Sequence, residues 1–327
     1  MKNELNIISM EGEVLLKDNL VRSSILPHTV SELDRNVTIL ADTMVEGAVY
    51  ANKLQIESGE TEIRGAVYTK LELHVDTGAK GKVIFKKSVA SSDSVTSYAK
   101  ECNLMFMADI NAKKVRLNHA FIAGSIYADE IQLEDCVVIG GVFSTKSIDL
   151  KKCIVGTFNS NSVYLEGETY LLLPSAFCGS PVEVMADAKL FNLSLADLGA
   201  IYKGTPQMQN TGVIEMDAKT DEMKTMLSED QKTMLVYSYS IAGKILATDL
   251  VDIERLQNHF LIGATAMGSQ ILRKYDLGTD VEGNKAVIEP ERVAKMFFDI
   301  LHGTVSIQQI DGTFSIQDLA SKIPGVI

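Results

Sequence analysis

The sequence predicts a mainly β protein: a parallel β-helix followed by a small, mostly α-helical C-terminal domain. Two observations support this prediction. One short phrase, a small residue, an apolar pair and then two aliphatic residues two positions apart, recurs along the chain. After residue 228 the apolar residues change from the alternation of strands to the spacing of amphipathic helices.

The repeated phrase is clearest within residues 108–165. Its four copies begin at Ala108, Gly124, Gly140 and Gly156, so the start positions differ by 16 each time (124−108, 140−124 and 156−140). The aliphatic residues alternate as they do along a β-strand. A further short apolar run precedes each copy, so each repeat contains three short strands joined by corner residues.

A chain that turns three corners and then repeats is predicted to be a parallel β-helix. One coil cannot bury its inward side chains alone, whereas stacked coils share a continuous core. Strands 16 positions apart should therefore pair laterally and in parallel. The glycine that opens the phrase is expected at a corner with positive φ. The alternative is a β-sandwich, whose strands recur roughly every 8–12 residues without one repeated phrase.

The first coils are predicted upstream of this region. The phrase recurs at Gly47 with Leu54 and Ile56, at Gly65 with Leu71 and Leu73, and at Gly81 with Val89. The next copy starts 27 positions after Gly81 (108−81), and the interval contains the serine-rich segment 88–101. We therefore expect a distorted coil or a surface loop at 88–101. The whole β-helix is predicted over residues 36–204.

Both ends of the β-helix are expected to be covered, because a bare terminal coil exposes apolar side chains and unpaired backbone groups. Residues 1–35 are the predicted N-terminal leader and cap. Within it, residues 14–16 and Val21 would form an edge strand or an irregular first coil. Residues 182–184 are read as another coil strand, and a short helix from Ser194 to Tyr202 would close the second end.

The C-terminal part is predicted as a linker, 205–227, and an α-helical domain, 228–327. A capping-box pattern opens the first helix at Ser228, which should run through Met234, Leu235, Ile241, Ile245 and Leu246, and Asp249 opens the second. Pro290 opens a third that ends near Gly303. Its apolar face is Val293, Met296, Phe297, Ile300 and Leu301. A terminal β-hairpin is expected around Asp311 and Gly312.

Composition and charge exclude several classes of function. The 327 residues carry a formal net charge of −12. Such an acidic chain does not present the basic surface of a nucleic-acid-binding protein, and it disfavours docking on anionic lipid. No window reaches the roughly 18 apolar residues of a membrane span, and the N-terminus lacks the apolar core of a signal peptide. The expected location is the cytoplasm, and nothing in the sequence indicates membrane association.

The sequence contains few residues in patterns that indicate chemistry. Cys136 and Cys153 are 17 positions apart and should stack in neighbouring coils, as a metal pair or disulfide or, as we favour, as small buried core residues. His119, at a predicted corner, is either a general base or, as we favour, a surface residue. Phosphate-binding loops, dinucleotide-binding fingerprints and nucleophile elbows are absent from the sequence. We therefore predict no catalytic, cofactor-binding or metal-binding residue and no cofactor.

A face of small residues lies on the predicted second helix. It consists of Gly263, Ala264, Ala266 and Gly268. Small residues allow either self-association or close helix packing inside the domain, and we favour packing.

Four stretches, 47–56, 65–73, 124–133 and 156–165, share a glycine, a short apolar pair and two alternating aliphatic residues. This pattern resembles that of the bactofilins, the polymer-forming cytoskeletal proteins, over roughly residues 36–204. The resemblance implies a right-handed β-helix that polymerises end to end without nucleotide. It also implies a scaffold, cytoplasmic or membrane-adjacent, in bacteria and some archaea. That family has no catalytic residues to carry over.

The chain departs from the bactofilin pattern in its C-terminal domain, because typical members have short disordered tails instead. Such a domain would cover one end of the β-helix and stop assembly at a dimer. The expected function is a non-enzymatic scaffold that self-associates through β-helix ends and recruits another protein with its C-terminal helices. The alternative is a β-helix enzyme or ligand-binding protein for a sugar or acyl substrate, with a groove near His119 or segment 88–101.

Overall fold

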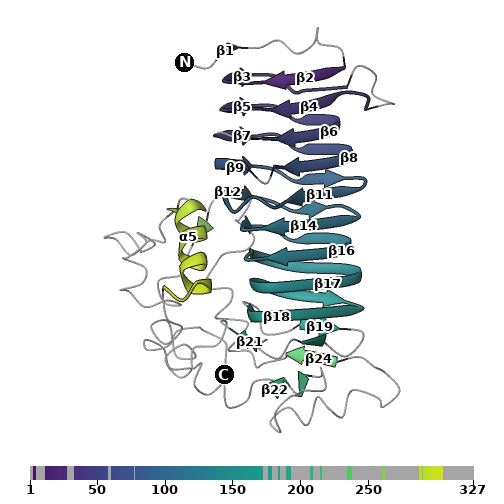
Figure 1. Ribbon diagram of the computed structural model, residues 1–327, viewed down its shortest axis with the longest axis vertical. Coiled ribbons are helices and arrows are strands. Elements are labelled where there is room, and N and C mark those ends of the chain that lie inside the picture. The colour runs from purple at the N-terminus through teal and green to yellow at the C-terminus, as the bar shows by residue number, and fades with distance from the viewer. Residues whose placement is uncertain are drawn as a thin grey trace, which may run out of the picture. The chain divides into compact units, whose positions relative to one another are not determined.

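The computed structural model describes residues 12–27, 33–57, 60–76, 78–171 and 290–304, together with the backbone of several short strands outside these ranges. The chain is mainly β and forms a parallel solenoid of about 7 turns, with coils of about 18 residues (Figure 1). Its contacts divide it into two units. The first is Met1–Cys136 with Phe143–Thr145, and the second is Val137–Val142 with Lys146–Ile327.

Three columns of stacked parallel strands make up the coils of the first unit. Column A contains β2 (Glu13–Leu16), β4 (Asn36–Ile39), the second halves of β6 (Val49–Ile56) and β8 (Val67–Val75), β11 (Ser94–Ser97), β14 (Lys114–Asn118) and the second half of β16 (Ile126–Glu134). Column B contains β3 (Asn19–Val21), β5 (Thr43–Val45), β7 (Thr61–Ile63), β9 (Lys80–Phe85), β12 (Glu101–Phe106) and β15 (Ala120–Ile122). Column C contains Ile25, the first halves of β6 and β8, β10 (Val89–Ser91), β13 (Ile110–Asn111) and the start of β16.

The pairing register confirms the parallel stack that the repeated phrase predicts. Val115 pairs with Ile131 and Leu117 with Leu133, so partners lie 16 positions apart (131−115 and 133−117). Inward residues of one column lie directly above one another, so the core consists of continuous rows. One such row in column A is Val14, Val37, Leu54, Leu73, Val95, Val115 and Ile131, and all seven are buried.

The predicted coil length of about 16 residues does not hold outside that region. Leu54 and its partner Leu73 are 19 positions apart (73−54). Leu73 and Val95 are 22 positions apart (95−73), whereas Val115 and Ile131 are 16 apart (131−115). The pairing of these strands stays parallel while the segments between the paired residues differ in length.

The serine-rich segment 88–101, expected to be a distorted coil or a surface loop, belongs to a longer coil of the stack and is not a loop. It contains β10 and β11, which take their places in columns C and A. Val89 pairs with Val67 on one side and with Ile110 on the other. The interval of 27 positions (108−81) arises because Gly81 does not occupy the position of the other phrase glycines. Gly81 instead lies in β9 of column B, where it pairs with Cys102.

Leu71 is not a core residue either. The register between β6 and β8 shifts after Ala51, so Leu54 pairs with Leu73 and Ile56 with Val75. Leu71 is 41% exposed, on the outside of this irregularity. The sequence phrase predicts Leu71 and Leu73 as the inward pair of this coil, whereas the inward pair is Leu73 and Val75, two positions later.

Strands of the predicted leader belong to the stack. Strand β2 pairs in parallel with β4, and β3 pairs in parallel with β5. Strand β1 (Asn3–Glu4) pairs in parallel with β3. Val14, Leu16 and Val21 are fully buried. The interpretation of these residues as a first coil is therefore confirmed, and regular parallel pairing begins well before residue 36.

The second unit continues with the same kind of pairing. Its strands are β17 (Val137–Ser160), β18 (Ser162–Leu171), β19 (Ala176–Cys178), β20 (Glu183–Val184) and β21 (Lys189–Asn192). Ile148 pairs with Val163, and Leu150 with Leu165. Leu165 also pairs with Val184, which confirms the coil strand predicted at 182–184.

Two inward threonines in the first unit create an unusual feature of the core. The hydroxyl oxygens of Thr61 and Thr69 are buried without a hydrogen-bond partner. Thr43 pairs with Thr61 in register, but its hydroxyl donates to the carbonyl oxygen of Ala41 at 2.8 Å. A buried hydroxyl without a partner loses its hydration and gains nothing in return.

We expect Thr61→Val and Thr69→Val each to raise the free energy of unfolding by about 1 kcal/mol, because valine fills the same space without a buried polar atom. Thr43→Val is the matched control and should lower stability by a similar amount, because it breaks a hydrogen bond. Urea unfolding followed by circular dichroism measures both. Equal destabilisation by all three substitutions would show that the two hydroxyls have partners.

The predicted third helix is confirmed. Helix α5 (Pro290–Leu301) begins at the proline, and Gly303 follows it with φ 73°. A glycine in this conformation is a common helix terminator, and here its N–H donates to the carbonyl of Ile300 at 3.0 Å. The predicted apolar face, Val293, Met296, Phe297, Ile300 and Leu301, is buried.

The first two predicted helices are not confirmed, and short strands lie within both. Strand β24 (Met234–Tyr237) pairs antiparallel with β19, and β25 (Phe260–Leu261) pairs antiparallel with β26 (Val287–Ile288). Met-Leu-Val-Tyr is a contiguous apolar run, and periodicity alone cannot assign such a run to helix or strand. Within the predicted linker, β22 (Gln207–Met208) pairs antiparallel with β23 (Ile214–Glu215).

Several other predictions fall outside the described residues. These are the helix from Ser194 to Tyr202, the small-residue face at 263–268 and the terminal hairpin around 311–312. Among the described residues, none of the helices has both the length and the apolar character that a membrane span requires.

Candidate functional site

The corner between β14 and β15 brings a histidine and a carboxylate together. His119 occupies the corner with φ 49°, and Asp135 occupies the equivalent corner one coil later with φ 53°. The Nδ1 atom of His119 and the Oδ2 atom of Asp135 are 2.7 Å apart, and the two side chains are 24% and 23% exposed. The backbone N–H of His119 donates to the carbonyl of Glu134 at 3.0 Å.

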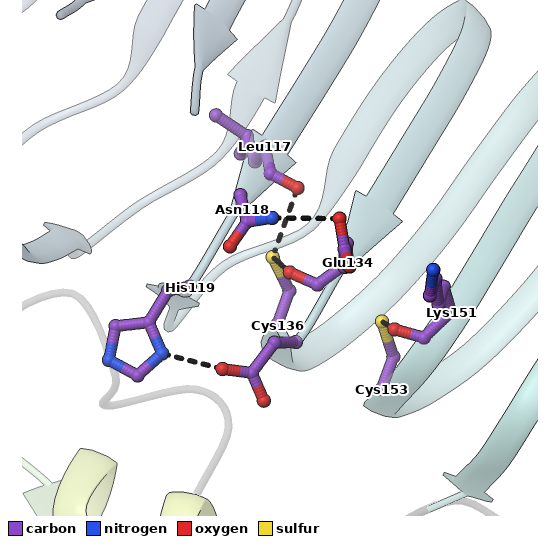
Figure 2. A network of polar contacts seen from close by, with 8 residues as sticks. Leu117, Asn118, His119, Glu134, Cys136, Lys151 and Cys153 are labelled. Carbon is purple, nitrogen blue, oxygen red and sulfur yellow. Dashed lines mark hydrogen bonds and ion pairs between the residues drawn. The ribbon is translucent and has the colours of Figure 1, made fainter. Parts of the chain in front are cut away.

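The neighbouring residue of each corner is paired in the same way. The amide nitrogen of Asn118 donates to Oε2 of Glu134 at 2.8 Å. Figure 2 shows Asn118, His119 and Glu134 around this turn of the chain. Both contacts join residues 16 positions apart (134−118 and 135−119). The prediction that His119 lies at a corner is confirmed, and its partner Asp135 could have been found by applying the same spacing.

A left-handed backbone conformation is the local reason for these tight corners. Asp18, His119, Asp135 and Lys152 have φ between 49° and 56°, and Gly167 has φ 67°. Aspartate and histidine tolerate this conformation better than most residues, and glycine adopts it freely. Each of these corners contains one residue in the left-handed conformation, which changes the direction of the chain. The aspartate and histidine residues at these corners therefore have a structural reason to be there, whether or not they also take part in chemistry.

The His119–Asp135 pair can orient an imidazole and accept or hold a proton. A carboxylate that accepts a hydrogen bond from one ring nitrogen directs the other nitrogen away from it, as in general-base pairs. Taken alone, the pair supplies two candidate metal ligands, fewer than the four of a structural zinc site. Such a pair is compatible with a structural role at the corner and with proton transfer.

The cysteines of the described region are buried and form no disulfide bonds. They are Cys102, Cys136 and Cys153. The thiol of Cys136 donates to the carbonyls of Glu134, at 3.2 Å, and Leu117, at 3.5 Å (Figure 2). That of Cys153 donates to the carbonyl of Lys151 at 3.4 Å. The interpretation of Cys136 and Cys153 as small core residues is supported by this burial. Their stacking on each other would join the two units and stays a prediction.

Burial raises the pKa of the Cys102 thiol to about 11, because the thiolate would lose its hydration. We therefore expect Cys102 not to react with a thiol reagent at pH 8 until the protein is unfolded in urea. The stabilising contribution of the neutral thiol is complete below about pH 8.5, the pKa of an unperturbed cysteine. It is lost as the pH rises towards 11.

The control for this experiment is a Tyr98→Cys variant, whose position is 45% exposed and whose thiol should react at once. Rapid labelling of native Cys102, shown by mass spectrometry of its peptide, would contradict the burial.

The outer faces carry ladders of polar and aromatic side chains. Glu46 lies 3.9 Å from Arg22 and 3.8 Å from Arg64, which belong to the coils on either side. Tyr50 and Tyr68 are register partners with ring centroids 6.3 Å apart. Exposed ion pairs contribute little to stability, but opposite charges on successive coils disfavour a shifted register.

Within the described part of the chain, the first coil has an open strand edge at β2. Among the described strands, β2 pairs with β4 alone. The carbonyls of Gly12 and Leu16 accept hydrogen bonds from Asn36 and Leu40 on the β4 side. In a parallel pair, alternate residues face opposite sides, so the N–H and C=O of Leu15 point away from β4. The Leu15 side chain is also 52% exposed.

An edge of this kind is a template for pairing with another chain. Of the sites described here, it has the clearest capacity for an interaction. The groove predicted at segment 88–101 has no loop to form it, because both strands of that segment lie within the stack. Comparisons with protein-family models, with curated proteins and with solved structures give no match for this chain.

Proposed function

We propose that the protein is a non-enzymatic scaffold that self-associates through the ends of its β-solenoid. The observation that carries this proposal is the edge of β2, whose Leu15 backbone groups face away from the only described neighbour. A solenoid coil is built to pair with a coil above it and a coil below it. A second copy of the chain offers the same pattern of strands.

The finer parts of the proposal rest on the repeated phrase. The resemblance to bactofilins supports a right-handed, polymer-forming, cytoskeletal protein of the cytoplasm. The apolar face of α5 is buried within the chain and supports a packed C-terminal region, through which the protein would recruit another protein. The acidic charge of the chain argues against nucleic acid as the partner.

The proposal is tested by the mass of the full-length chain in solution. Light scattering over a concentration series should show a dimer or larger assemblies, with negative-stain microscopy to give their shape. Leu15→Pro should reduce the assembly, because proline removes an N–H that faces the open edge and leaves the β2–β4 hydrogen bonds in place. Leu15→Thr keeps that N–H and is the matched control. A monomer at all concentrations would contradict the proposal.

A second candidate function, proton-transfer chemistry on a sugar or acyl substrate, is favoured by one observation, the 2.7 Å contact between His119 and Asp135. Thermal-shift screening with nucleotide sugars and acyl-coenzyme A compounds tests it. A ligand that raises the melting temperature of the protein but not that of His119→Ala would support it. No shift with either class would count against it.

A further inference from the structure

The outward residues along β2 form a charge pattern centred on Leu15. Glu13 lies two positions before Leu15 and Lys17 lies two positions after it, directly beyond the end of the strand, and all three side chains are exposed. Val14 and Leu16, which alternate with them, are fully buried. A negative charge, an apolar side chain and a positive charge therefore follow one another along the outer side of the open edge.

This pattern is complementary to a second copy of itself that runs in the opposite direction. Two copies that meet at the same edge through a twofold axis perpendicular to the strands pair antiparallel, and each patch contacts its own equivalent. With the axis at Leu15, Glu13 of each copy lies opposite Lys17 of the other. Opposite charges in facing positions stabilise a strand pair, whereas like charges destabilise it. A parallel, in-register pairing of two β2 strands would instead place Glu13 opposite Glu13.

The backbone groups of the edge agree with the same register. In an antiparallel pair, two opposite residues whose N–H and C=O groups face the partner strand exchange two hydrogen bonds. Leu15 has these groups directed away from β4, so the two Leu15 residues can exchange both bonds. The N–H of Lys17 already donates to Oδ1 of Asn19 at 2.6 Å. The contribution of Lys17 to the contact therefore comes mainly from its charged side chain.

Strand β1 leaves room for this contact. It pairs with β3 in column B, on the side opposite β5. A coil climbs one strand spacing over its three sides, so the edges of columns B and C lie about one third and about two thirds of a spacing behind that of column A. The twofold axis brings column B of one copy against column C of the other. With one spacing between the two β2 strands, that gap is about two spacings, roughly 10 Å, which holds one strand.

We propose that β2 pairs antiparallel with β2 of a second copy, with the twofold axis at Leu15 and reciprocal contacts between Glu13 and Lys17. This inference rests on the proposed function, and it names the surface and the partner through which the first coil acts. Such a contact joins two copies only, because both copies use the same edge. An assembly larger than a dimer needs a second contact elsewhere on the chain.

The test reverses the two charges one at a time. Glu13→Lys places lysines opposite each other at both symmetric positions, and Lys17→Glu places glutamates there. Each should raise the concentration at which half of the chain is assembled by roughly tenfold, because two attractions become two repulsions. Glu13→Lys makes the acidic chain less negative and Lys17→Glu makes it more negative. A general effect of net charge would therefore move the two variants in opposite directions.

Two combinations should restore the assembly. The double variant, Glu13→Lys with Lys17→Glu, has attractive pairs again in reversed order. An equimolar mixture of the two single variants should form heterodimers, because both contacts between unlike copies are attractive. Sedimentation at low ionic strength, where exposed charges are least screened, measures the assembled fraction. Native mass spectrometry, with one variant labelled with heavy nitrogen, identifies the heterodimer.

Glu57→Lys and Lys100→Glu are the matched controls, because both residues are exposed and lie outside the first coil, and neither should change the assembly. Single variants that assemble like the unaltered chain, or controls that weaken assembly as much, overturn the β2 contact but not the scaffold. A mixture or a double variant that assembles no better than the single variants overturns the antiparallel register. A monomer for the unaltered chain at all concentrations overturns both the contact and the proposed function.

Discussion

Gly65→Ala is expected to lower the free energy of unfolding by about 3 kcal/mol or more, the range of severe overpacking. Gly47, Gly65, Gly124 and Gly156, which open copies of the sequence phrase, do not have the expected positive φ, whereas Gly81 does, at 89°. A Cβ at Gly65 would instead overlap the backbone of Gly47 in the coil below. The two backbones approach closely enough for Gly65 N–H to donate to the Gly47 carbonyl at 3.1 Å.

The same crowding recurs along the stack. A Cβ at Gly124 would overlap Ala108 and Asp109, and one at Gly156 would overlap Gly140. Backbone cannot move aside as a flexible side chain can, so each substitution must separate two coils. Gly78→Ala is the matched control, because its Cβ would meet only the Asp76 carboxylate at 3.4 Å. Urea unfolding should show a large loss for Gly65→Ala and little change for Gly78→Ala. Similar midpoints for both would contradict the close approach.

Phe106→Ala should cost about 3–5 kcal/mol, the usual range for removal of a buried phenylalanine side chain. Phe106 is 1% exposed and pairs in register with Phe85 below and Ile122 above. The rings of Phe85 and Phe106 are stacked, with centroids 4.8 Å apart and an interplanar angle of 9°. The substitution leaves a cavity that the neighbouring coils cannot close without losing their own strand pairing.

Chemical denaturation of Phe106→Ala measures this cost, with Tyr98→Ala as the control. Tyr98 is a large aromatic residue of the neighbouring corner, but it is 45% exposed. Its truncation should change the free energy of unfolding by less than about 1 kcal/mol. A loss for Phe106→Ala as small as that of the control would mean that the ring does not lie in a packed core.

The sequence predicts the stacked rows well because a parallel register demands the same kind of side chain in every coil. Ile131 and Leu133 repeat Val115 and Leu117 for this reason. Corner lengths leave no such trace, since an added corner residue need not change which side chains of the strands face inward. The serine-rich strands at 88–101 do not follow the period of the later coils, because Val67 and Val89 are 22 positions apart (89−67). The sequence therefore leaves both a distorted coil and a surface loop open there.

Contacts between coils were the hardest to predict. The need for glycine at Gly65 comes from the backbone of Gly47, one coil earlier in the chain, which no local rule about φ includes. Periodicity does not identify strand β24, which lies in the first predicted helix, because Met234–Tyr237 is apolar throughout and shows neither period. Its pairing with β19 depends on residues that are distant in sequence. The carboxylate beside His119, by contrast, follows from the coil spacing once the stack is known.

Distances between spin labels on the outer face of column A test the stacked coils most directly. Register pairs connect Thr38, Gln55, His74, Thr96, Arg116 and Gln132 in successive coils. Genetically encoded labels at positions 38 and 116 should therefore be about four strand spacings apart, roughly 19 Å, and labels at 38 and 132 about five, roughly 24 Å. An increase of about 5 Å between the two pairs is the predicted result. Distances that do not grow by one strand spacing per coil, as in an antiparallel sandwich, would contradict the solenoid and the scaffold built on it.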